Sequence, residues 1–156
     1  MKKRIFIAIG ILISIAIVLY FALFFIFNTK ASQAKATTQS EQLINVWGNY
    51  TDEASGERLA SLKPYLSTEL YASYQEDFAA LAKMKEKFGP SPESKITIES
   101  VDISQYNPGS FIIKITGTRE FPELNEKNPT EIEVEIKKIM GKYKIVRLDE
   151  DMNLSQ

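Results

Sequence analysis

The side chains that could perform acid–base chemistry in this chain are few in kind. The sequence has no histidine and no cysteine, so proton transfer or nucleophilic attack would fall to Asp, Glu, Lys, Tyr, Ser or Thr. The candidate carboxylates are Asp77, Glu99 and Asp102, and each would need burial to raise its pKa toward neutrality. Asp77 adjoins Glu76 on the polar side of a predicted helix, and Asp102 faces away from its apolar neighbours. The sequence therefore predicts no catalytic residue and no enzyme activity.

The missing residue types also exclude other classes of site. Without cysteine there are no disulfides and no thiolate zinc sites, and without histidine the commonest metal ligand is absent. The 156 residues carry 19 basic and 20 acidic side chains, a balance that gives no concentrated basic face for nucleic acid. We expect no metal, no cofactor and no nucleic-acid partner.

One strand carries a regular row of carboxylates. Glu131, Glu133 and Glu135 alternate along a predicted strand and could meet a metal or a cationic partner. Pairing with lysines on the neighbouring strand is the simpler interpretation, because opposite charges across strands are mildly stabilising. Lys142 and Lys144 are the expected partners.

A set of aromatic residues could line a ligand pocket. Its members are Trp47, Tyr50, Tyr74, Phe78 and Phe111. Aromatic side chains at helical spacing more often pack in a core or between helices, so core packing is the simpler interpretation. Tyr74 is the one inward position with a polar group, and a tyrosine is not ionised near pH 7.

The chain begins with a predicted membrane anchor. Residues 5–27 form a run of about 23 residues without a charge, which as a helix spans about 34 Å and exceeds the ~30 Å hydrocarbon core. The basic residues at positions 2–4 precede the run, so the positive-inside rule predicts a cytoplasmic N-terminus and an extracytoplasmic domain. A cleaved signal peptide ending near Ala34 and Ala36 is the alternative, but its apolar region would be only about 7–15 residues long.

Three helices are predicted after the anchor. Residues 28–37 are polar without apolar periodicity and indicate a linker. A capping box at residues 38–41 predicts the start of the first helix. A short helix over about residues 52–62 follows, and a longer one begins at Ser67 and stops at Gly89.

From Lys95 the apolar period changes from 3.6 to 2, which indicates strands. A phase shift near Glu99 predicts a β-bulge. The predicted strands cover residues 95–103, 111–121, 131–136 and 143–148, with turns at 107–109 and 141, a loop at 123–129 and a polar tail after 148. Helices followed by antiparallel strands predict an α+β domain, with three helices packed on one face of a curved four-stranded sheet.

Three segments resemble the nuclear transport factor 2-like, or cystatin-like cone, superfamily. They are residues 45–50 (NVWGNY), 59–67 (LASLKPYLS) and 141–148 (GKYKIVRL). The closer likeness is to bacterial members with one N-terminal anchor, among them inner-membrane scaffold subunits of type IV secretion and conjugation machines. The resemblance implies a cone domain over about residues 38–150. It does not specify a function, because this fold hosts enzymes, binders and scaffolds alike, and it carries no functional residue over, because the matched positions are structural in this kind of domain.

The expected organisation is a cytoplasmic stub and anchor over 1–27, a linker over 28–37, an extracytoplasmic cone over 38–150 and a tail over 151–156. We predict a non-enzymatic interaction or assembly module, embedded in the lipid bilayer through residues 5–27. Its partners would be other membrane or extracytoplasmic proteins, or further copies of itself. A binder of a small apolar ligand in the cone cavity is the first alternative, and a cone-fold enzyme is the second.

Overall fold

The computed structural model describes residues 2–107 and 109–152 of the chain. The chain divides into two compact units, Met1–Ala34 and Lys35–Gln156, and each is described by itself. The predicted boundary between anchor and domain falls at residues 28–37, and the division after Ala34 lies inside that range.

The first unit is the apolar part of helix α1, which runs from Lys2 to Gly48. Its described side chains from Ser14 to Leu23 are exposed, and they include large apolar ones such as Val18 and Phe21. Within the described residues this is the one helix long and apolar enough to cross a membrane. A helix that is apolar all round is typically buried in a protein core or spans a membrane.

The predicted linker and capping box are wrong as secondary structure, because α1 continues through both without a break. Residues 28–47 contain no glycine or proline, and Ala, Lys and Gln are good helix formers. Ser40, inside the proposed capping box, is buried and bonds back to the Ala36 carbonyl over 3.1 Å. The helix ends at Gly48, where an added Cβ would lie 2.5 Å from an Ile96 methyl carbon.

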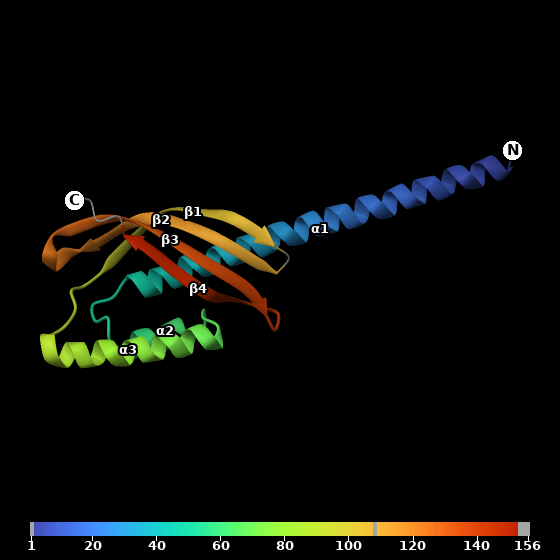
Figure 1. Ribbon diagram of the computed structural model, residues 1–156. Coiled ribbons are helices and arrows are strands. Elements are labelled where there is room, and N and C mark those ends of the chain that lie inside the picture. The colour runs from blue at the N-terminus through green and yellow to red at the C-terminus, as the bar shows by residue number, and fades with distance from the viewer. Residues whose placement is uncertain (1, 108, 153–156) are drawn as a thin grey trace. The chain divides into compact units, whose positions relative to one another are not determined.

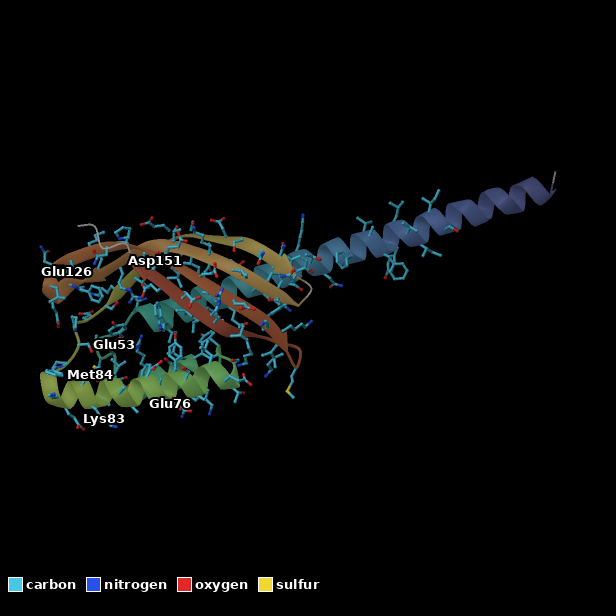
Figure 2. All side chains as sticks on the ribbon, viewed as in Figure 1. Glu53, Glu76, Lys83, Met84, Glu126 and Asp151 are labelled. Atoms are coloured by element: carbon cyan, nitrogen blue, oxygen red, sulfur yellow. The ribbon has the colours of Figure 1, made fainter. Side chains whose placement is uncertain are left out.

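Two further helices follow. Helix α2 covers Gly56–Leu62, starting later than predicted, and the Ser55 hydroxyl caps it by accepting from the Arg58 amide. Helix α3 covers Thr68–Phe88, is capped by Ser67 and ends at Gly89 with φ 91°, as the sequence predicted. In Figure 1 α2 and α3 lie on the same side of the sheet, and in Figure 2 Glu76 and Lys83 point from the side of α3 that faces away from it.

The sheet has four antiparallel strands in the order β1-β2-β3-β4. The strands are β1 (Lys95–Asn107), β2 (Ser110–Phe121), β3 (Glu126–Ile139) and β4 (Lys142–Met152), with a 3-10 turn at Pro122–Leu124 between β2 and β3. A register shift between Ile98 and Ser100 confirms the predicted bulge near Glu99. The α+β architecture is confirmed.

Strands β3 and β4 extend into segments that were predicted as a loop and a tail. Strand β3 begins at Glu126, inside the predicted loop, and β4 continues to Met152, inside the predicted tail; residues 153–156 of that tail lie outside the described residues. Apart from Pro129 and Met152 these two segments consist of polar residues, so no apolar alternation marks them as strands. They are held by backbone pairing and by polar contacts such as the 2.6 Å ion pair between Lys127 and Glu120.

The core lies between one face of the sheet and the helices. Buried side chains of β2 and β3 alternate along each strand, and they pack against Leu43 and Ile44 of α1, Leu62 of α2 and Phe78 of α3. On β2 and β3 six inward residues have almost no exposed area: Phe111, Ile113, Ile115, Ile132, Val134 and Ile136. These six are the inward strand positions that the sequence predicted.

The carboxylate row of β3 is paired, but by other residues than predicted. Lys114 of β2 bonds Glu131 over 2.6 Å, and Arg147 of β4 pairs with Glu133 and reaches Glu135 over 3.7 Å. The proposed partners lie at the start of β4, too close to the hairpin turn, because Lys144 pairs in register with Lys137, and Lys142 with Ile139.

Candidate functional site

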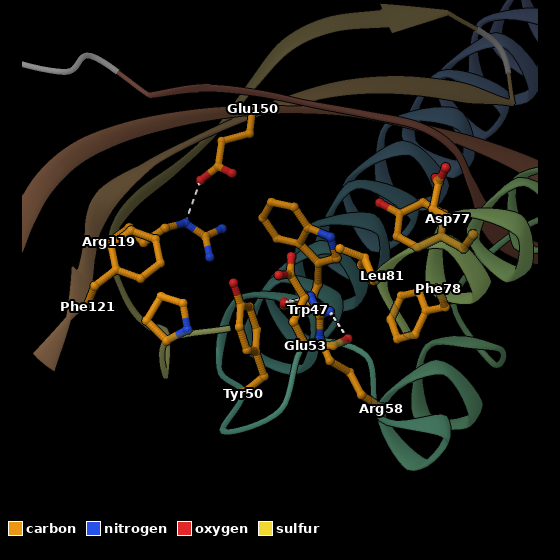
Figure 3. A pocket seen from close by; sticks show the side chains of 12 residues that line it. Trp47, Tyr50, Glu53, Arg58, Asp77, Phe78, Leu81, Arg119, Phe121 and Glu150 are labelled. Carbon is orange, nitrogen blue, oxygen red and sulfur yellow. Dashed lines mark hydrogen bonds and ion pairs between the residues drawn. The ribbon is translucent and has the colours of Figure 1, made fainter. Parts of the chain in front are cut away.

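The domain contains a pocket of about 460 Å³ at the end of the sheet where β2 and β4 finish. Its walls come from the last turn of α1, the segment that follows it, α2, α3 and those two strand ends (Figure 3). The lining residues are Trp47, Tyr50, Glu53, Arg58, Tyr74, Asp77, Phe78, Leu81, Pro92, Arg119, Phe121 and Glu150. The lining thus mixes aromatic rings with charged groups of both signs.

The wall from α1 is fixed by the way that helix ends. Trp47 occupies the last turn, and Tyr50 lies two residues after Gly48, where the helix ends. A backbone bridge then holds Tyr50 against Ser94, with Tyr50 N to Ser94 O at 3.0 Å and Ser94 N to Tyr50 O at 2.9 Å. Trp47 and Tyr50 therefore sit on rigid backbone rather than on a free loop.

Arg119 is the most buried charged residue of the pocket. Its Nε donates to Glu150 Oε1 over 2.8 Å, and its Nη1 donates to the Ser94 hydroxyl over 2.7 Å. The guanidinium also stacks on the Trp47 ring, 4.7 Å from the ring centre. Its Nη2 is buried and has no hydrogen-bond partner among the described residues. Glu150 is held in turn by the Thr130 hydroxyl over 2.8 Å, so the pair is well ordered but leaves one arginine donor unused.

Arg58 of α2 joins the helices around the pocket. Its Nη2 donates to the Trp47 carbonyl over 2.5 Å and its Nη1 to the Glu53 carbonyl over 2.9 Å. The Trp47 carbonyl belongs to the last turn of α1, where carbonyls lack helical partners and a cation is favourable. The guanidinium lies 4.2 Å from the Tyr50 ring centre and 5.1 Å from that of Phe78, and burial lowers the pKa of Arg58.

The two pocket tyrosines are neutral at physiological pH. Burial raises the pKa of Tyr74 to about 12. Burial, assisted by the nearby Glu53 carboxylate, also raises the pKa of Tyr50. Both hydroxyls can therefore donate a hydrogen bond to a ligand, but neither is a general base.

The carboxylates singled out in the sequence do not form a buried acid. Asp77 lines the pocket, contrary to its predicted place on the polar side of α3, but it is exposed to solvent. Glu99 and Asp102 lie on β1 outside the pocket, where Glu99 accepts from the Thr118 hydroxyl over 2.7 Å and Asp102 from the Ser100 hydroxyl over 3.2 Å. None of the three has the burial that would prepare it for acid catalysis.

The structure brings together four of the five aromatic residues proposed as pocket lining. Trp47, Tyr50, Tyr74 and Phe78 all line the pocket, whereas Phe111 does not. Phe111 is buried at the opposite end of β2, about 26 Å along the strand from Arg119 at ~3.3 Å per residue. There it packs against Tyr106 and Tyr143, with ring centres 5.2 Å and 5.6 Å away. Whether the pocket receives a ligand stays a prediction.

Apart from Asp77, the charged residues of the pocket were not identified by the sequence analysis. Arg119 falls in the same alternating phase as Ile113, Ile115 and Gly117, and this phase was the available signal for an inward charge. Glu150 was assigned to the end of the domain beyond the last strand, and neither Glu53 nor Arg58 lies in a recognisable motif.

Comparison with known proteins finds likeness in structure alone. No protein-family model and no curated protein matches the sequence. Among solved structures, CagV of Helicobacter pylori strain 26695, described as a VirB8 homologue of a type IV secretion system, superimposes with a TM-score of 0.54. The two sequences are 9% identical, and the match covers 76% of this chain and 98% of CagV.

The VirB8 protein of Agrobacterium tumefaciens matches with a TM-score of 0.57 at 9% identity, over 79% of this chain and 94% of VirB8. The fold is VirB8-like. At this level of identity the likeness is one of fold, and it confirms the fold that the sequence resemblance implied. Each match covers nearly the whole of the solved chain and somewhat more than three quarters of this one.

Proposed function

We propose that this protein is a membrane-anchored assembly subunit of a type IV secretion or conjugation complex. The observation that carries the proposal is the VirB8-like cone directly preceded by a single apolar helix. CagV is described as a component of a type IV secretion system, and the same assignment for this chain rests on shared architecture rather than on shared residues.

The distribution of charge supports an extracytoplasmic position for the cone domain. The three residues that precede the apolar run are Lys2, Lys3 and Arg4, and such clusters stay on the cytoplasmic side. In this arrangement residues 5–27 contact lipid, and the domain from Ala36 onward meets partner proteins outside the cytoplasm. Protease added to intact spheroplasts should then remove the domain, and full protection of the domain would reverse the orientation.

The role is non-enzymatic in this proposal. The buried charges of the pocket are engaged in structure, Arg119 with Glu150 and Arg58 with backbone carbonyls, and its tyrosines are neutral. Deletion of the gene in its own host should abolish secretion or conjugative transfer, and the full chain should restore it. Transfer that continues unchanged in the deletion strain would exclude the assembly role.

Two conservative variants separate scaffold from enzyme. Tyr74→Phe keeps the ring and removes the hydroxyl, and Asp77→Asn keeps the size and removes the charge of the exposed pocket carboxylate. Both should restore transfer as well as the unchanged chain does. Failure of either variant at normal protein level and normal melting temperature would favour catalysis in the pocket.

Ligand binding in the pocket is the second candidate function, favoured by the unused Nη2 donor of Arg119. A ligand satisfying that donor would carry an acceptor such as a carboxylate, in contrast to the wholly apolar ligand expected from the sequence. Trp47 is the sole tryptophan of the chain and lines the pocket, so its fluorescence reports occupancy. Titration with small aromatic carboxylates should change it; an unchanged emission across the series argues against this candidate.

A further inference from the structure

The tip of the β3–β4 hairpin carries apolar side chains that the domain does not use. Met140 is 99% exposed and Ile139 is 40% exposed. Met140 and Gly141 have positive φ angles of 49° and 79°, the pattern of a two-residue turn that favours Asn-Gly. A methionine is therefore neither the best residue for this turn nor part of the core.

Lysines surround the same tip. Lys137 and Lys138 precede it, and Lys142 and Lys144 follow it. Lys63 joins them across a hollow of about 470 Å³ that Met140 and Ile139 also line. In the part of the chain that the structure describes, only Lys137 of these five has a carboxylate partner, Glu135 at 2.9 Å.

Two of the remaining lysines make contacts that do not neutralise their charge. Lys144 donates to the Pro64 carbonyl, and Lys63 lies over the Tyr71 ring; Glu69 is the one acidic residue that lines the hollow. The chain after residue 27 is acidic overall, since removing the three basic residues at positions 2–4 from the 19 leaves 16 against 20 acidic ones, a formal charge of −4. The hairpin tip is thus a basic and apolar patch on an acidic domain.

The tip belongs to the end of the domain through which the chain enters from the anchor. Gln39 of α1 donates its side-chain amide to the Tyr143 carbonyl of β4 over 2.6 Å. Gln39 follows the last residue of the apolar run by about 12 residues, which reach at most ~40 Å when extended. The chain therefore limits the distance between Gln39, which contacts the hairpin, and the end of the apolar run to at most ~40 Å.

We infer that the β3–β4 tip docks on the anionic surface of the bilayer that anchors the chain. Met140 and Ile139 enter the headgroup region, and Lys138, Lys142 and Lys144 meet lipid phosphates. Apolar side chains flanked by lysines have the composition of interfacial membrane contacts, and each lysine near an anionic surface strengthens partitioning about fivefold. This inference rests on the proposed membrane anchoring and adds a second contact with the same membrane.

Docking would give the domain a defined orientation. Strand β3 has 14 residues and therefore spans about 46 Å at ~3.3 Å per residue. The tip lies at one end of this strand, and the pocket lies toward the other end. A domain resting on its tip would hold the pocket away from the lipid, toward partner proteins.

The test uses a chain whose only thiol is at the tip. Because the sequence has no cysteine, Met140→Cys can be labelled with an environment-sensitive fluorophore in the full-length protein. The labelled protein is reconstituted in bilayers of phosphatidylcholine alone or of equimolar phosphatidylcholine and phosphatidylglycerol. We expect a blue shift and quenching by lipid-borne quenchers in the anionic bilayers, both reversed by high salt. Lys138→Gln together with Lys142→Gln should weaken the docking about 25-fold.

Leu124→Cys provides the matched control, since Leu124 is 54% exposed in the turn at the opposite end of β3. Its label should remain in water in both bilayers. A tip label that stays in water in anionic bilayers, while the chain resists alkaline extraction, overturns the inference and leaves the anchor intact. Protection of the tip only when an acidic partner protein is added would assign the patch to that protein and overturn it equally. Release of the chain by alkaline extraction would overturn both the anchor and the docking.

Discussion

The Arg119–Glu150 pair can be tested by removing its negative charge without changing its shape. The two side chains are 4% and 14% exposed. In Glu150→Gln the amide oxygen can still accept from Arg119 Nε and from the Thr130 hydroxyl, but Arg119 is left as a buried cation without a counter-charge. Removing one partner of a buried pair costs about 3–5 kcal/mol. Glu150 retains some contact with solvent, so we expect the lower end, about 3 kcal/mol.

That loss is large for a domain of this size. At about 0.05–0.15 kcal/mol per residue, a unit of roughly 120 residues has a free energy of unfolding of about 6–18 kcal/mol. Urea denaturation of a soluble fragment beginning at Gln33, which keeps the buried Ala36, would measure it through Trp47 fluorescence. With m of about 1–3 kcal/mol/M, the midpoint should fall by roughly 1–3 M urea.

The control is the same chemical change on the opposite face of the sheet. Glu133 pairs with Arg147, and both side chains are nearly half exposed, so Glu133→Gln should cost less than about 1 kcal/mol. If Glu150→Gln costs no more than this control, Arg119 is solvated and the description of the pocket as a site with a buried charge is wrong. Arg119→Met combined with Glu150→Leu should cost less than the two single changes added together, because no unpaired charge remains.

Three further substitutions test the fold around the site. Gly117→Ala places a Cβ 2.3 Å from the Thr97 carbonyl oxygen, so its melting temperature should fall sharply; an unchanged value would mean that the β1–β2 bulge can relax. Phe78→Ala truncates a core side chain that is 5% exposed and should lower the free energy of unfolding in urea by about 3–5 kcal/mol. A variant that stays stable and loses only partner binding would show that Phe78 belongs to an interface and not to the core. The hydrogen bond from Lys85 holds the pKa of Asp52 below its ordinary value. A lowered pKa stabilises the folded state above the unfolded pKa of about 4, and this stabilisation is lost as the pH falls through the folded pKa. The stability lost between neutral and acid pH should therefore be smaller in Lys85→Met than in the unchanged chain.

The order and type of the elements were predictable because burial on one face imposes a period. Inward residues of β2 and β3 alternate with outward ones over their whole apolar length, and the bulge near Glu99 appeared as a break in that alternation. Likewise the two ends of α3 are determined by single residues. The Ser67 hydroxyl caps its first turn, and Gly89 adopts the positive φ angle that follows its last turn. Where the interactions that define an element lie within a few residues of one another, the element can be predicted from the sequence.

The course of α1 was not predictable from periodicity. Residues 28–37 lack an apolar stripe, which indicated a linker, but a helix needs only residues that tolerate the conformation and a neighbour to extend from. Helical segments flank residues 28–37 on both sides. The apolar run precedes them, and the turn with the core residues Leu43 and Ile44 follows them. A capping box is informative only where the helix has free amides to cap, and here the preceding turn already uses them.

The buried charges of the pocket show what can be predicted from the alternation of inward and outward positions along a strand. On β2 the inward phase runs through Ile115 and Gly117 to Arg119, so the sequence alone could predict a buried cation and, with it, the need for an anion nearby. The anion could not be named, because β3 lies between β2 and β4 and the partner depends on two registers at once. A register shift at Glu135/Ile136 changes the phase of β4, which brings Leu148 into contact with the core and places Glu150 two residues further along the same face. The alternation along β2 therefore predicts that an inward charge exists. Which residue neutralises that charge is determined by the shifted pairing between β3 and β4.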